Sequence, residues 1–273
     1  MPMIPKCNLH THTTFCDGKH SAEEMVLAAI DAGMEVLGFS GHSSLPFSLD
    51  WCMTEQKQKE YQQEILRLQK VYADQLEILL GIEQDFFTGR PAYSYDYVIG
   101  SVHCLPFEEE VVMVDESASI LTDAANRYCG GDLYELCRKY YELVACVADE
   151  TACDIVGHFD LITKFNEGGK MFSEEDPRYL HSAMEALDAL LEKDLVFEIN
   201  TGAISRGYRI TPYPNPILLR RIAEKRGRIT ITSDAHAKEN LLCAYSDAVS
   251  LAKASGFGSV EILTRKGWHT QAI

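Results

Sequence analysis

The stretch Ile229-Thr-Ile-Thr-Ser-Asp234-Ala-His236 runs from a short apolar segment directly into a carboxylate and an imidazole. An apolar run of this length, bounded by polar residues, is typical of a strand that is buried on both faces. Five further histidines follow short apolar runs in the same way: His10, His12, His42, His103 and His158. The run Ile78-Leu-Leu-Gly-Ile-Glu83 ends in a carboxylate instead. These endings predict a shared metal site at one end of a parallel sheet.

Seven strand-like runs alternate with helix-like stretches along the chain. The runs lie at residues 7–10, 36–40, 77–82, 97–102, 154–157, 195–199 and 229–233. Strand followed by helix, about seven times, indicates an α/β fold with a parallel barrel of the TIM type or a close variant. An open doubly wound sheet is the main alternative, but it gathers ligands only from the few strands beside its switch point. We expect the barrel, because every polar strand ending then reaches one site.

The predicted helices are amphipathic and have recognisable ends. Ser21-Ala-Glu-Glu24 opens the first helix with a capping box, and Gly33 is placed to end it. Further helices are expected over residues 54–73, 132–149, 178–191 and 216–225. We expect residues 104–131 and 164–177 to form long loops over the barrel mouth, and 259–263 to add an edge strand or close the barrel. A single domain over residues 1–273 is expected.

Composition narrows the choice of partners and location. The chain has 273 residues and a net charge of −16, so a nucleic-acid backbone is a poor partner for its surface. An acidic protein can still bind a phosphorylated substrate where bound cations reverse the local charge. The nine cysteines lack paired spacing, which predicts free thiols in a reducing compartment. No apolar run suggests a signal peptide or a membrane span, so we expect a cytoplasmic protein and predict no oligomeric state.

The spacing of the histidines supports metal binding. His10-Thr-His12 places two imidazoles on one side of an extended segment, and Asp234-Ala-His236 repeats that geometry. Each pair by itself is weak evidence, and a single histidine is more often a hydrogen-bonded core residue. Together, however, several buried imidazoles and carboxylates are hard to satisfy without cations. Glu83 in particular is costly to bury after an apolar run unless it is paired, and a carboxylate bridging two metals would resolve that cost.

Other polar residues near these runs fit more than one role. Asp17 precedes Gly18 just after the first histidine pair, and it fits a turn as well as a ligand. His20 is expected at the surface, and no role is assigned to His181 or His269. Asp85 follows Glu83 by two residues, so it either supports a ligand from behind or caps a loop.

At these residues the chain resembles the polymerase-and-histidinol-phosphatase (PHP) superfamily, most closely its monofunctional histidinol-phosphatase branch. The matching blocks are His10-Thr-His12, Asp17-Gly18, Gly41-His42, Gly81-Ile-Glu83, Gly100-Ser-Val-His103, Gly157-His158-Phe-Asp160, Glu198-Ile-Asn200-Thr and Thr232-Ser-Asp234-Ala-His236. The resemblance implies a distorted (β/α)7 barrel with three metal ions, drawn from zinc, iron and manganese. It implies a first metal at His10, His12, Glu83 and Asp234, a second at Glu83, His103 and His158, and a third at Asp17, His42 and His236.

A phosphomonoester needs its oxygens neutralised and a nucleophile in line with the leaving alkoxide. Paired metals do both, because they lower the pKa of a bound water and stabilise charge on the phosphoryl oxygens. We therefore expect direct attack of an activated water on phosphorus, without a phosphoenzyme. Asp234 or His236 is a candidate for assisting proton transfer.

Basic and acidic residues elsewhere are candidates for holding the substrate. Arg206 is the first candidate for the phosphate clamp, because a guanidinium can bind two oxygens at once; Arg209 and Lys164 are next. Asp160 and Glu198, or carboxylates of the mouth loops, are candidates for the ammonium and imidazole of histidinol.

The leading hypothesis is hydrolysis of L-histidinol phosphate to histidinol and phosphate in histidine biosynthesis. The alternatives keep the site and change the substrate to another small phosphomonoester, a nucleotide or phosphotyrosine. A non-catalytic metal-binding barrel is less favoured, because so many ligands spread over three metals leave open coordination positions.

Overall fold

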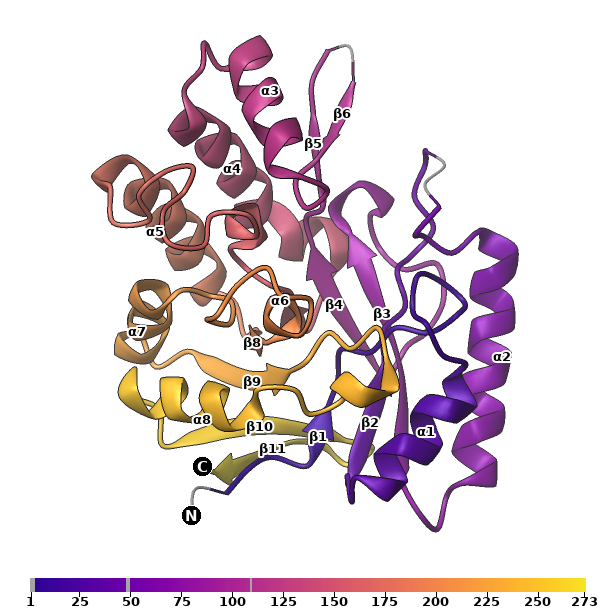
Figure 1. Cartoon of the computed structure of the whole chain (residues 1–273). Helices are drawn as coiled ribbons and strands as arrows, with labels where there is room; N and C mark the ends of the chain where they lie inside the picture. Colours follow the sequence, from indigo (N-terminus) through magenta and orange to yellow (C-terminus); the bar gives the residue numbers. More distant parts are fainter. Residues whose placement is uncertain (1–2, 48–49, 109) are drawn as a thin grey trace.

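The computed structural model describes residues 3–47, 50–108 and 110–273. Its main sheet has seven strands in the order β1-β2-β3-β4-β7-β8-β9, and every neighbouring pair is parallel (Figure 1). These strands are β1 (Cys7–Asn8), β2 (Val36–Phe39), β3 (Glu77–Asp85), β4 (Tyr97–Ser101), β7 (Ile155–Val156), β8 (Val196–Asn200) and β9 (Arg228–Thr232). Each strand overlaps one of the predicted runs, because a strand that is buried on both faces consists mainly of apolar residues.

The sheet curls into a nearly closed barrel. The segments that follow β1 and β9 form a parallel bridge at Thr11 and Ala235. There the amide of His12 donates to the carbonyl of Ala235 at 2.9 Å, and the amide of Ala235 donates to the carbonyl of His10 at 3.1 Å. An open sheet would leave β1 and β9 as unpaired edges, so the predicted TIM-like barrel is confirmed.

Helices cover the outside of the barrel, with α1 and α2 beside β2 and β3 and with α7 and α8 beside β9 (Figure 1). The helices are α1 (Ala22–Asp31), α2 (Glu55–Val71), α3 (Ala118–Tyr128), α4 (Leu133–Thr151), α5 (Pro177–Leu191), α6 (Gly202–Ser205), α7 (Pro216–Glu224) and α8 (Tyr245–Ala254). Short 3-10 turns are η1 (Phe86–Thr88), η2 (Leu161–Thr163) and η3 (Lys238–Asn240). Ser21 and Glu24 form the predicted capping box of α1. Gly33 follows that helix with a φ of +67°, which glycine adopts without strain.

Two sequence predictions about irregular regions are wrong. Residues 104–131 are not one long loop, because they contain the antiparallel hairpin β5 (Cys104–Pro106) and β6 (Val111–Met113) as well as α3. Strands of three residues are too short to leave a recognisable period. The run at 259–263 neither extends nor closes the barrel, because β10 (Ser259–Thr264) pairs with β11 (Gly267–Ala272) in a separate antiparallel hairpin. Helices α6 and α8 were not predicted either.

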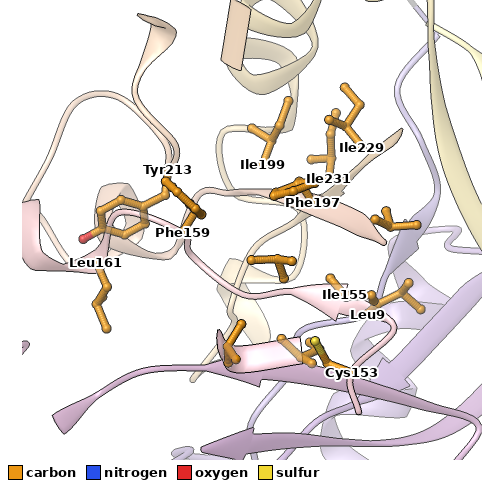
Figure 2. Close-up of a cluster of buried hydrophobic side chains, with 14 of the residues drawn as sticks. Leu9, Cys153, Ile155, Phe159, Leu161, Phe197, Ile199, Tyr213, Ile229 and Ile231 are labelled. Atoms are coloured by element: carbon orange, nitrogen blue, oxygen red, sulfur yellow. The ribbon is translucent and has the colours of Figure 1, made fainter. Parts of the chain in front are cut away.

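The barrel interior is filled by large side chains that glycines leave room for. Figure 2 shows apolar side chains of the core around β7, β8 and β9, including Ile155 and Phe197. On the neighbouring strand β4, the hydroxyl of Tyr97 donates to the carbonyl of Phe39 at 3.0 Å. A Cβ on Gly81 would lie 2.2 Å from the ring of Tyr97, so only glycine fits there.

Two observations bear on the predicted environment of the chain. All nine cysteines, each within the described residues, are free thiols. Within residues 3–47, 50–108 and 110–273, no helix has both the length and the apolar character needed to cross a membrane.

Candidate metal centre

The nine predicted ligands lie together where the barrel strands end. Seven of them lie within four residues after a strand: His10, His12, His42, His103, His158, Asp234 and His236. Glu83 lies near the end of β3, and Asp17 lies in the loop after the first histidine pair. Their ligand atoms form four overlapping groups, each with all atoms within 4.8 Å of one another: His12, Asp17, His42 and His236; His10, His12 and Asp234; His10, Glu83 and His158; and His42, Glu83 and His103. Parallel strands present their carboxyl ends at one edge, so residues far apart in the sequence meet there.

Glu83 occupies the centre of the cluster. Its Oε2 lies 2.9 Å from Nδ1 of His42 and 3.2 Å from Nε2 of His10. Its Oε1 lies 2.9 Å from Nε2 of His158 and 3.3 Å from Nε2 of His103. One carboxylate therefore contacts imidazoles from four strands, as a bridging ligand would.

Asp17 joins the outer part of the cluster. Its Oδ2 lies 3.1 Å from Nε2 of His236, and its Oδ1 lies 3.7 Å from Nε2 of His42. The ring of His236 stacks on that of His12 with 4.1 Å between their centroids. Asp17 is thus placed as a ligand would be, rather than only as a turn residue.

Four buried atoms of the cluster residues lack a hydrogen bond to any described residue: Nε2 of His10, Nε2 of His12, Oε2 of Glu83 and Nδ1 of His158. A buried polar atom without a partner costs about 1–3 kcal/mol, and coordination of a cation removes that cost. Imidazole nitrogens with carboxylate oxygens are a donor set that suits zinc, iron and manganese. The residues therefore fit a metal cluster.

Burial and electrostatic interactions shift the pKa values of these groups. Burial, together with His236 and His42, lowers the pKa of His12 to about 3, so its imidazole is neutral. Burial opposes ionisation of Glu83, but the nearby imidazoles, led by His10, hold its pKa well below the usual value. Burial also disfavours charge on His10, yet the carboxylates around it, led by Glu198, raise its pKa well above the usual value. A cation binding at such a nitrogen takes the place of the proton.

Two carboxylates hold ligand histidines from behind. Oε2 of Glu198 lies 2.9 Å from Nδ1 of His10 and accepts a hydrogen bond from the hydroxyl of Thr232 at 2.7 Å. Asp85 lies 3.1 Å from Nδ1 of His103, and it also caps η1. Such partners fix the tautomer and orientation of a ligating imidazole. Glu198 therefore holds the imidazole of His10, whereas the sequence suggested it as a substrate contact.

A cavity of about 620 Å³ opens above the cluster. Arg206 lines it, with one terminal nitrogen 3.0 Å from Oδ2 of Asp234 and the other 2.9 Å from Nδ1 of His236. Lys164 also lines the cavity and is buried, and its ammonium donates to the carbonyl of Asp115 at 2.7 Å. Arg206 thus lies beside the predicted ligands, where a phosphate would need a cation.

Other candidates lie elsewhere. Arg209 is directed away from the cavity and donates to the carbonyl of Thr163 at 2.8 Å and to Glu174 at 3.2 Å. Asp160 accepts from the amide of Asn215 at 2.8 Å, and burial raises its pKa to about 7. Both residues hold the loops around the mouth through these contacts and take no part in lining the cavity.

The remaining histidines stay outside the cluster. His20 accepts a hydrogen bond from the amide of Lys238 at 3.3 Å. His181 and His269 are exposed, on α5 and β11 respectively.

Several residues of the cavity wall were missed in the sequence. Trp51 packs its ring edge-on against His42 at 4.7 Å and lies 5.3 Å from His103. Glu116 and Tyr208 line the cavity as well. These residues come from irregular segments without a periodic pattern, so no sequence signal marks them.

The chain belongs to the PHP domain family, because the family model described as PHP domain matches residues 8–202. A relative from Deinococcus radiodurans, named a probable histidinol-phosphatase, is 31% identical over 97% of this chain and 99% of its own length. The histidinol-phosphatase of Bacillus subtilis is 25% identical over 86% of this chain and 95% of its own length. A histidinol phosphate phosphatase from Lactococcus lactis, solved with zinc, L-histidinol and phosphate, superimposes with a TM-score of 0.74. It is 22% identical and covers 98% of this chain and all of its own, so it supports the same fold.

Proposed function

We propose that this protein is a metal-dependent phosphomonoesterase that hydrolyses L-histidinol phosphate to L-histidinol and phosphate. One observation carries the proposal: nine imidazole and carboxylate side chains converge on the floor of a cavity that also holds Arg206. The relatives named histidinol-phosphatase, which match almost the whole chain, support the choice of substrate. The corresponding step belongs to histidine biosynthesis.

The cluster would hold three ions of zinc, iron or manganese. The first would bind His10, His12, Glu83 and Asp234, the second Glu83, His103 and His158, and the third Asp17, His42 and His236. When bound, such ions supply a strong nucleophile at neutral pH and neutralise the phosphoryl oxygens. Oε2 of Glu83, which is buried without a hydrogen bond, supports a bridging role, because Glu83 belongs to two of the four candidate ligand groups.

The side chains around the cluster would orient the ester. Arg206 would bind two phosphate oxygens through its paired nitrogens, as guanidinium groups do. Asp234 or His236 would hold or move the proton that the leaving alkoxide requires, and each lies about 3 Å from Arg206. Phosphorus would be attacked directly by solvent, so no phosphoenzyme would form.

The same geometry would also serve another small phosphomonoester, a nucleotide or phosphotyrosine. A non-catalytic barrel is disfavoured, because the cluster lines an open cavity, whereas structural metal sites are closed. A nucleic-acid partner is disfavoured by the net charge of −16. We propose that the enzyme works in the cytoplasm on a small substrate.

The test is phosphate release from L-histidinol phosphate and from a generic aryl phosphate, before and after chelation. We expect a much higher kcat/KM for L-histidinol phosphate, loss of activity on chelation and recovery when zinc or manganese is returned. Equal rates on both esters would refute the substrate assignment. Full activity of a metal-free preparation would refute the metal-dependent mechanism.

A further inference from the structure

The ligand histidines differ in what holds the ring nitrogen that faces away from the cluster. Nδ1 of His10 has Glu198 at 2.9 Å, and Nδ1 of His103 has Asp85 at 3.1 Å. For His12, the sulfur of Cys16 lies 3.5 Å from Nδ1, within hydrogen-bonding distance, whereas Oδ1 of Asp17 lies beyond it at 3.7 Å. The distance to the thiol is usual for a hydrogen bond to sulfur, which is a larger atom than oxygen.

The direction of this hydrogen bond follows from the other nitrogen of the same ring. Nε2 of His12 is buried without a hydrogen bond and lies 3.1 Å from Oδ1 of Asp234. An ion bound at Nε2 leaves the proton on Nδ1, which then donates to the sulfur. The thiol in turn donates to the carbonyl of Thr13 at 3.5 Å. Both polar hydrogens thus have an acceptor.

We propose that Cys16 is a positioning residue of the metal centre, whose thiol accepts a hydrogen bond from His12 and fixes the tautomer and orientation of that imidazole. The inference rests on the proposed function only in assuming that an ion binds His12.

The loop around Cys16 is held by its backbone, so the thiol is not needed to form it. The amides of Cys16 and Gly18 both donate to the carbonyl of Thr13 at 3.0 Å. The competing explanation is that the sulfur only fills space. It lies close to Gly41, where an added Cβ would be 3.5 Å from it. Packing and hydrogen bonding are separable, since valine fills the space of the thiol but accepts no hydrogen bond.

The experiment measures zinc affinity by competition with a coloured chelator, for the wild type, Cys16→Ser, Cys16→Val and Cys137→Ala. Loss of a partner behind a ligand costs about 10–100-fold in metal affinity, and we expect this loss for Cys16→Val. Cys16→Ser should stay within about threefold of the wild type, because a hydroxyl accepts the same hydrogen bond. Cys137→Ala is the matched control: it removes a buried thiol from α4, among apolar neighbours. Its zinc affinity should not change.

Melting temperatures with and without zinc provide a second readout, since a ligand stabilises the folded state in proportion to its affinity. The zinc-induced increase should shrink for Cys16→Val and persist for Cys16→Ser. Wild-type affinity in Cys16→Val would overturn the inference, and so would equal losses in the serine and valine variants. Because these measurements do not use turnover, a wild type that binds zinc but leaves L-histidinol phosphate intact would refute only the proposed substrate.

Discussion

Replacing Glu83 with glutamine removes one negative charge from the centre of the cluster and preserves the size of the side chain. The carboxylate contacts four imidazoles, one from each of four other strand ends, at 2.9–3.3 Å. Its Oε2 also lies 3.5 Å from a fifth imidazole, that of His12. Glutamine can offer only one neutral oxygen to those positions, while its amide nitrogen repels a cation. We expect loss of metal and of turnover in a folded protein.

The magnitude follows from the place of Glu83 in two of the four candidate ligand groups. Loss of a partner behind a ligand costs about 10–100-fold in affinity, so loss of a ligand should cost about 100-fold or more. A factor of 100 corresponds to about 2.7 kcal/mol for each ion. If two ions are affected and each loses about 100-fold in affinity, the combined affinity for both ions should fall by about 10⁴-fold.

The assay combines phosphate release from L-histidinol phosphate with metal content by mass spectrometry and with thermal unfolding. We expect Glu83→Gln to lose at least about 100-fold in kcat when metal is limiting. Glu77→Gln is the matched control, because Glu77 lies at the other end of the same strand, outside the candidate ligand groups. A Glu83→Gln variant with full metal content and wild-type turnover would refute the bridging role.

Three further predictions test the surroundings of the site and the core. Glu198→Gln should weaken zinc binding by about 10–100-fold in a chelator competition, because the imidazole it orients loses its charged partner; unchanged affinity would contradict this role. Gly81→Ala should lower the free energy of unfolding by about 3 kcal/mol in urea titrations, because its Cβ would lie 2.2 Å from Tyr97. Gly258→Ala has open space and should have little effect. Arg206→Ala should reduce kcat/KM for L-histidinol phosphate by about 10–100-fold, since charge-assisted hydrogen bonds are lost; an unchanged ratio would exclude it as the phosphate clamp.

The barrel and the convergence of polar strand endings could be derived from the sequence pattern, whereas Asp17 as a ligand and the division of ligands among three ions came from the family resemblance. Strands buried on both faces are largely apolar, so β2 and β4 appear as almost continuous apolar runs and β3 contains the run from Ile78 to Ile82. A polar group can follow such a run only where the strand leaves the core, so the residue after each run marks a strand end. Parallel order brings those ends together, and this is why a one-dimensional pattern indicated a three-dimensional cluster.

Contacts between distant segments were decided only by the tertiary structure. His10 and Glu198 are separated by 188 positions and meet because β1 and β8 lie on either side of β9 in the barrel. In the sequence, Lys164 and Arg209 are equivalent basic residues of irregular segments. In the folded protein Lys164 lines the cavity, whereas Arg209 points toward Thr163 and Glu174. Local sequence sets which residues end a strand, whereas the direction of each loop side chain depends on packing against neighbours that local sequence does not specify.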